Sequence, residues 1–219
     1  MCSRQAVFSP GNATVVLLAQ DKFPERTVQA NVITSERDPA VRIELPKQVR
    51  YVGANRWILY GVADCELHVF LEAGAQKNVQ RLYWVQFEGF LPSKPESKYN
   101  YHSPQTLKMA NMDFDVTVRV GSNNDAPKPG SDLEHVRGLI QAKGYKLPAG
   151  LMTVRLVHLL AEHKRKELMI IYGEDVTPTE FSATELLPGG KGSEQWTTIG
   201  KDLVERAEKK ITFRKLSEQ

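Results

Sequence analysis

CELHVFLEAGAQKNVQRLYWVQFEGF, residues 65–90, is the stretch that decides the fold. Its two halves, 65–72 and 79–90, each place apolar side chains at alternate positions, a pattern that predicts β-strands. The turn that starts with AGAQ (73–76) is too short for a crossover helix, so the two strands must pair antiparallel. The segment therefore predicts part of an antiparallel β-meander.

The same pattern extends the sheet along the rest of the chain. Before this stretch, strands are predicted over 13–19, 27–35, 40–45, 50–52 and 56–62, with Gly53-Ala54-Asn55 as a hairpin loop. After it, strands are predicted over 111–120, 151–161 and 167–173. The loop at 91–105 contains three prolines and leaves the sheet, because proline cannot donate to a strand ladder.

Two amphipathic helices complete the prediction, over 131–143 and 193–211. Ser131 and Glu134 have capping-box spacing, and Gly144 follows the end of the first helix. The fold class is therefore α+β: a curved antiparallel meander with both helices packed on one face. Residues 1–219 are expected to form a single domain with a frayed terminus over about residues 1–10.

Composition limits the classes of function. Hydrophobic residues make up 41% of the chain and charged residues 25%, which is typical of a globular protein. The formal charge of +3 comes from 29 basic and 26 acidic residues without a concentrated basic face, so nucleic acid is not expected as a partner.

Neither a membrane span nor a secretory signal is expected, since no apolar run has the necessary length. The two cysteines, Cys2 and Cys65, match no disulfide framework and no metal motif, and periodicity places Cys65 on the apolar side of its strand as an inert thiol. The cytoplasm is the default compartment. The alternative is the cell envelope or periplasm, if Cys2 is what remains of a processed lipoprotein signal.

NMDFDVTVRV (111–120) carries two carboxylates on one side of a predicted strand. Asp113 and Asp115 lie two residues apart, so their Cα atoms are separated by about 6.5 Å and their side chains point the same way. Such a pair could hold a divalent cation or act as acid and base. The simpler interpretation is the solvated face of an antiparallel strand.

Glu66 and His68 have the same spacing in the stretch 65–72 and could form a general base with an orienting partner. The simpler interpretation is again an exposed polar pair. In the proline-bounded loop, Tyr99, Tyr101 and His102 are candidates for recognising a partner or ligand. Alternatively, these aromatic side chains fold back and plug the edge of the sheet.

The first hypothesis is a non-enzymatic binding or interaction module that uses the sheet face and the loop at 91–110, with a protein or small molecule as the bound species. The second is a hydrolase or metal-dependent enzyme in which Asp113, Asp115, Glu66 and His68 converge. The third is a structural lipoprotein of the cell envelope. No cofactor and no metal site is predicted, and neither the ligand nor the oligomeric state follows from the sequence.

Overall fold

In the computed structural model, residues 23–103, 105–160 and 163–216 are described. Strands fill most of the chain before the first helix: β1 (Thr27–Gln29), β2 (Val32–Ser35), β3 (Val41–Glu44), β4 (Arg50–Leu59), β5 (Ala63–Ala73), β6 (Val79–Phe90), β7 (Gln105–Met109) and β8 (Met112–Ser122). The remaining elements are α1 (Asp132–Ala142), β9 (Gly150–Leu159), β10 (Lys166–Asp175), α2 (Trp196–Lys210) and β11 (Thr212–Lys215). Two short 3-10 helices, η1 (Ala75–Lys77) and η2 (Thr177–Thr179), lie in connections.

The strands form two antiparallel sheets, and the predicted α+β class is confirmed. The large sheet has seven strands in the order β4-β5-β6-β10-β9-β8-β7, and the small sheet has four in the order β1-β2-β3-β11. β5 and β6 pair along almost their whole length, with Cys65 opposite Glu88, as expected from residues 65–90. In the order of the large sheet, this hairpin lies between the edge strand β4 and the central strand β10.

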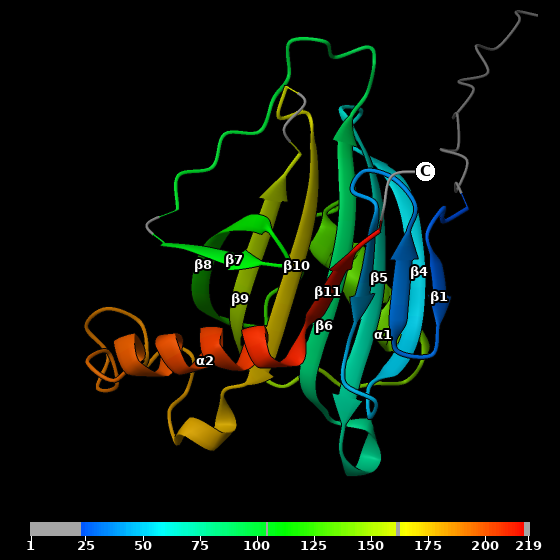
Figure 1. Ribbon diagram of the computed structural model, residues 1–219. Coiled ribbons are helices and arrows are strands. Elements are labelled where there is room, and N and C mark those ends of the chain that lie inside the picture. Colours follow the sequence, from blue (N-terminus) through cyan, green and yellow to red (C-terminus); the bar gives the residue numbers. More distant parts are fainter. Residues whose placement is uncertain (1–22, 104, 161–162, 217–219) are drawn as a thin grey trace, which may run out of the picture.

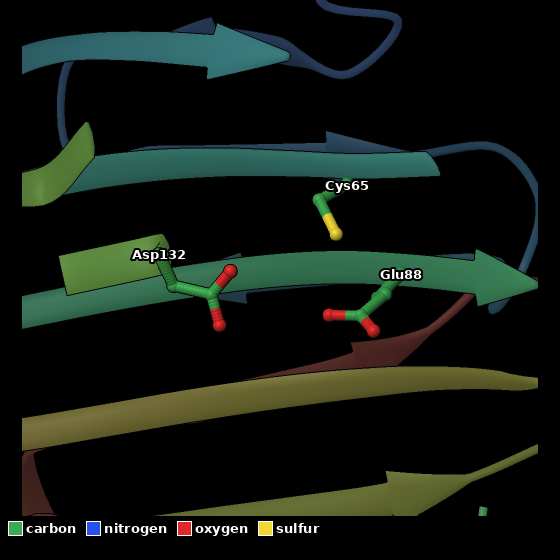
Figure 2. A group of neighbouring side chains, drawn as sticks. All are labelled: Cys65, Glu88 and Asp132. Carbon is green, nitrogen blue, oxygen red and sulfur yellow. The ribbon is translucent and has the colours of Figure 1, made fainter. Parts of the chain in front are cut away.

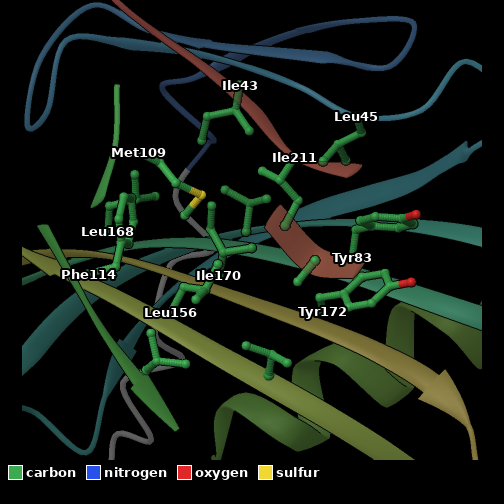
Figure 3. Close-up of a cluster of buried hydrophobic side chains, with 14 of the residues drawn as sticks. Ile43, Leu45, Tyr83, Met109, Phe114, Leu156, Leu168, Ile170, Tyr172 and Ile211 are labelled. Atoms are coloured by element: carbon green, nitrogen blue, oxygen red, sulfur yellow. The ribbon is translucent and has the colours of Figure 1, made fainter. Parts of the chain in front are cut away.

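Apolar side chains cover both faces of the large sheet. The inner face, which looks toward the small sheet, carries Phe70, Tyr83, Leu168 and Ile170. Figure 3 shows the last three packed with Ile43 of the small sheet, with Leu45 just after β3, and with Ile211. The outer face carries Leu67, Val69 and Trp84. Since β5 is buried on both sides, each face of the sheet needs its own cover.

The two helices lie on opposite faces of the large sheet, so the prediction that both pack on one face is wrong. Val136 and Ile140 of α1 join the outer cluster, while Leu203 and Ala207 of α2 join the inner one. Figure 1 shows α2 in front of the large sheet and α1 behind it. The error arose because the polar side of 111–120 suggested a wet face, which holds for β8 near the sheet's edge but not for the central strands.

Several predicted boundaries also differ from the structure. Residues 27–35 form a hairpin of β1 and β2 rather than one strand, and Gly53 lies at a bulge within β4 instead of in a hairpin loop. A glycine inside a strand often marks such a bulge. The chain turns later, at Tyr60 and Gly61, which both adopt positive φ. β7 and β11 were not predicted, and the predicted strand at 13–19 lies outside the described residues.

Candidate functional site

Asp113 and Asp115 lie on the solvated side of β8, as the simpler interpretation expected. Asp113 is exposed and Asp115 half-buried, while Phe114 and Val116 between and beside them are buried. Both aspartates line an open cavity of about 920 Å³, together with His158 and with side chains of both charges. This mixture of charges does not select a particular ligand.

Glu66 and His68 are buried on the inner face, so the prediction that they form an exposed pair is wrong. The reason is the small sheet, which covers this side of β5. The catalytic hypothesis that joins them to Asp113 and Asp115 is also wrong. β5 and β8 are four strand spacings apart in the sheet order, or about 19 Å, and the two pairs face opposite sides.

The carboxylate of Glu66 is fully hydrogen-bonded. It accepts from the backbone amides of Glu25 and Arg26, both at 2.8 Å, from Arg26 Nη1 at 3.2 Å, and interacts with His68 Nε2 at 3.0 Å. Burial alone would raise the pKa of Glu66, but His68, these amides and the Arg26 charge outweigh it and hold the pKa at about 2. Such saturation is typical of a structural ion pair that fixes the chain before β1 to the large sheet.

The loop after β6 folds back onto the outer face, in agreement with the alternative that its aromatic residues plug the sheet. Tyr99 is only 8% exposed, and its ring stacks on Phe90 at 4.4 Å and on Tyr101 at 6.0 Å. Recognition of a partner by Tyr99, Tyr101 and His102 together requires that all three are exposed, but Tyr99 is buried and Tyr101 is half-buried. Only His102 is exposed, and whether it binds a partner stays a prediction.

Arg165 holds this loop in place from the turn before β10. Its guanidinium donates to the carbonyls of Leu91, Lys94, Pro95 and Ser97. The amide of Tyr99 adds a 2.8 Å hydrogen bond to the carbonyl of Lys164. The loop is therefore an ordered cover on the sheet, and its tyrosines are positioned above particular side chains.

Those side chains form a polar group that the sequence did not reveal. Cys65, Glu88 and Glu167 are direct neighbours across β5, β6 and β10, because Cys65 pairs with Glu88 and Glu88 with Glu167. Asp132, at the first turn of α1, joins them from above the sheet. We call Cys65, Glu88, Asp132 and Glu167 the outer-face cluster.

Glu88 is the best-ordered carboxylate of the outer-face cluster. Tyr99 donates to its Oε1 at 2.7 Å, and Gln86 Nε2 donates to its Oε2 at 2.8 Å. Gln86 is itself fixed by Trp84 Nε1, which donates to its Oε1 at 2.9 Å. This chain of hydrogen bonds sets the direction of the Glu88 carboxylate.

Two other oxygens of the cluster lack partners. Glu167 is 2% exposed and its Oε2 has no hydrogen-bond partner, and Asp132 Oδ1 is likewise buried and unpartnered. The nearest cation is Arg155, whose Nη2 is 3.9 Å from Glu167 Oε1 and whose guanidinium lies 4.6 Å from the centre of the Tyr101 ring. One cation thus stands near three carboxylates, an arrangement that is unfavourable without further compensation.

The electrostatics of the cluster reflect this imbalance. Burial raises the pKa of Glu167 to about 7, with Glu88 and Asp132 acting the same way and Tyr101 and Arg155 opposing them in part. Burial and the charge of Glu88 raise the pKa of Asp132 to about 6. Burial, with Glu88 and Asp132, also raises the pKa of the Cys65 thiol, which is protonated at neutral pH.

The cluster has the donors for a metal ion. The Sγ of Cys65 and one carboxylate oxygen each of Glu88 and Asp132 lie within 4.8 Å of one another. Figure 2 shows the three side chains converging above β6. A sequence signal did exist: Glu88 and Glu167 are acidic residues in phase with Trp84 and Met169 on central strands, where a carboxylate needs a reason.

The protein is therefore an α+β protein of two antiparallel sheets. One face of its large sheet carries a group of carboxylates with too little positive charge nearby to balance them. No known family, curated protein or solved structure matches the chain significantly. Within the described residues, neither helix combines the length and the apolar character needed to cross a bilayer. Cys2 lies outside the described residues, so the lipoprotein hypothesis stays a prediction.

Proposed function

We propose that this protein is a non-enzymatic binding module that takes a cationic ligand at the outer-face cluster. The observation that carries the proposal is the pair of buried, unpartnered carboxylate oxygens, Glu167 Oε2 and Asp132 Oδ1. A buried acceptor without a partner costs about 1–3 kcal/mol, and more when it is charged. A bound cation offsets this cost, by direct contact at Asp132 and through its charge at Glu167.

Access to the cluster supports binding in solution. Glu88, Asp132 and Arg155 are half-buried, so part of the group is accessible to solvent. The close approach of the donor atoms suits an ion or a small cationic group rather than a bulky ligand. Tyr99 orders the binding carboxylate and Tyr101 stacks against Arg155, which gives the loop a role in shaping the site.

Thermal unfolding in the presence of a panel of cations tests this proposal. The panel consists of Mg²⁺, Ca²⁺, Mn²⁺, Zn²⁺ and spermidine, added at equal ionic strength after dialysis against a chelator. At least one is expected to raise the melting temperature, since a ligand at 100 times its Kd stabilises the native state by about 2.7 kcal/mol. Asp132→Asn and Glu167→Gln are expected to lose this stabilisation.

Asp113→Asn is the matched control, because it removes an exposed carboxylate from the same sheet and leaves the cluster intact. It should respond to cations as the parent protein does. The proposal is overturned if no cation stabilises the protein, or if Asp132→Asn and Glu167→Gln, shown to be folded by circular dichroism, respond as strongly as Asp113→Asn.

A further inference from the structure

We infer that the cation is a divalent transition-metal ion such as Zn²⁺, ligated by the Cys65 thiolate and by the carboxylates of Glu88 and Asp132. This inference rests on the proposed function and names the chemical class of its ligand. It differs from the expectation drawn from sequence, which treated Cys65 as an inert packing residue.

The geometry of the three donors is close to that of a bound ion. Zn²⁺ lies about 2.3 Å from sulfur and about 2.1 Å from carboxylate oxygen, so its ligand atoms stand roughly 3.5 Å apart in a tetrahedral site. The three donors already lie within 4.8 Å of one another. Small rotations of the Glu88 and Asp132 side chains close the remaining gap, while Cys65 is fixed in the central strand β5 (Figure 2).

Glu167 is an independent indication of a missing positive charge. It lies directly opposite Glu88 in the pair formed by β10 and β6. Its side chain is only 2% exposed, and its Oε2 has no hydrogen-bond partner. Like charges at directly opposed positions destabilise a sheet. A divalent ion on Glu88 compensates this repulsion through its charge, and a water molecule can fill its fourth ligand position.

The surroundings of Glu88 resemble the outer shell of a metal site. Ligating carboxylates in such sites are themselves hydrogen-bonded, which fixes their orientation. Here Tyr99 and Gln86 each hold one oxygen of Glu88, and Trp84 holds Gln86. All three donors are neutral, so they orient Glu88 without neutralising it.

The donor set selects the class of ion. A thiolate disfavours Mg²⁺ and Ca²⁺, which prefer oxygen ligands, and favours Zn²⁺ and neighbouring transition metals. Binding breaks the S–H bond of Cys65, forms a sulfur–metal bond and releases the proton to solvent, with no change of oxidation state. The three anionic ligands leave one negative charge beside a divalent ion, and Arg155 lies on the same face to balance it.

Titration with Co²⁺ tests the inference, because a thiolate–Co²⁺ bond gives a near-ultraviolet charge-transfer band and tetrahedral Co²⁺ gives intense visible bands. The protein is reduced, freed of metal and used as the Cys2→Ser variant, so that Cys65 is its one thiol. We expect a charge-transfer band that saturates at one Co²⁺ per chain and disappears when Zn²⁺ is added in equal amount.

Two further variants in the same background separate the ligands. Cys65→Ser is expected to abolish the charge-transfer band and to weaken binding by at least about tenfold, since even changes outside the ligand set have effects of this size. Asp132→Asn is expected to weaken binding while the remaining band still reports the thiolate. Circular dichroism and thermal unfolding confirm that each variant is folded.

The outcomes distinguish the inference from the proposed function. If Co²⁺ binds through Asp132 but gives no thiolate band, and Cys65→Ser binds as well as its parent, the inference is overturned and an oxygen-only cation site remains. The same holds if Ca²⁺ or spermidine binds at the cluster and Co²⁺ does not. If neither Co²⁺ nor any cation of the thermal-unfolding panel binds, the inference and the proposed function both fail.

Discussion

A buried carboxylate has opposite surroundings on the two faces of the large sheet. On the inner face, Glu66 receives hydrogen bonds from two backbone amides and from Arg26, and its pKa falls to about 2. On the outer face, two strands away, Glu167 keeps an unpartnered oxygen and its pKa rises to about 7. Both side chains are 2% exposed. Burial therefore does not decide the ionisation of these groups; the donors around them do.

The contrast separates a structural acid from a candidate binding acid. The inner pair is complete, and any added ligand would have to displace existing hydrogen bonds. The outer-face cluster has acceptors to spare and lacks positive charge. Strongly perturbed carboxylates of this kind concentrate at functional sites, although structural networks can also perturb them.

The largest effect should come from breaking the inner pair. Glu66→Gln is expected to destabilise the protein by about 3–5 kcal/mol, because Arg26 is left without its carboxylate and the amide group opposes the backbone donors. Urea unfolding at pH 7 measures the change. Glu167→Gln is the matched control, and it should not lower stability. Equal losses in the two variants would contradict the distinction between the faces.

The next largest effect should be the change in the free energy of unfolding with pH. For Glu167, a folded pKa above the ordinary 4.5 means that the native state holds the proton more tightly, so stability is lost as pH rises from about 4.5 to about 7. The loss amounts to roughly 3 kcal/mol, at 1.36 kcal/mol for each pH unit. For Glu66 the sign is reversed, and stability is lost as pH falls from 4.5 toward 2.

Between pH 4.5 and pH 7, Glu167 and Asp132, whose pKa values are raised to about 7 and about 6, both make the metal-free protein less stable as the pH rises. Urea unfolding in the presence of a chelator, from pH 4 to pH 8, gives the profile. Glu167→Gln is expected to reduce the loss of stability above pH 4.5, with the remainder due to Asp132, and to be more stable than the parent protein at pH 8. A parent profile that rises from pH 4.5 to pH 8 would contradict the imbalance assigned to the outer-face cluster.

Sequence patterns predicted the sheet better than the site. Alternation identified β6 to the residue, and it separated Asp113 from Phe114 correctly. It could not show what covers each face, because only the folded chain brings the small sheet over Glu66 and buries the polar side of β5. Alternation therefore led to the same prediction, an exposed side chain, for Asp113, which is exposed, and for Glu66, which is buried.

The outer-face cluster was missed for a related reason. Its residues come from β5, β6, β10 and α1, which are separated by up to about a hundred positions along the chain. Strand order, with β10 rather than β7 beside β6, makes Glu167 a neighbour of Glu88. No local spacing encodes that order. The acidic residues on otherwise apolar central strands were the available signal.

A smaller effect is expected from the loop that covers the cluster. Tyr99→Phe removes the hydroxyl that donates to Glu88 and should destabilise the metal-free protein by about 1.5–3 kcal/mol, the usual range for a hydrogen bond to a charged group. The ring stack on Phe90 is retained. Tyr101→Phe serves as the comparison. A Tyr99→Phe protein as stable as the parent would mean that Glu88 does not depend on this donor.

The smallest effect should be at the exposed end of the same loop. His102 and Asp113 are both exposed, and surface substitutions away from packed or paired groups change stability by no more than about 0.5 kcal/mol. His102→Ala and Asp113→Asn should therefore both fall within that range and leave the pH profile unchanged. If His102→Ala instead weakened cation-dependent stabilisation, the binding surface would extend from the outer-face cluster to His102.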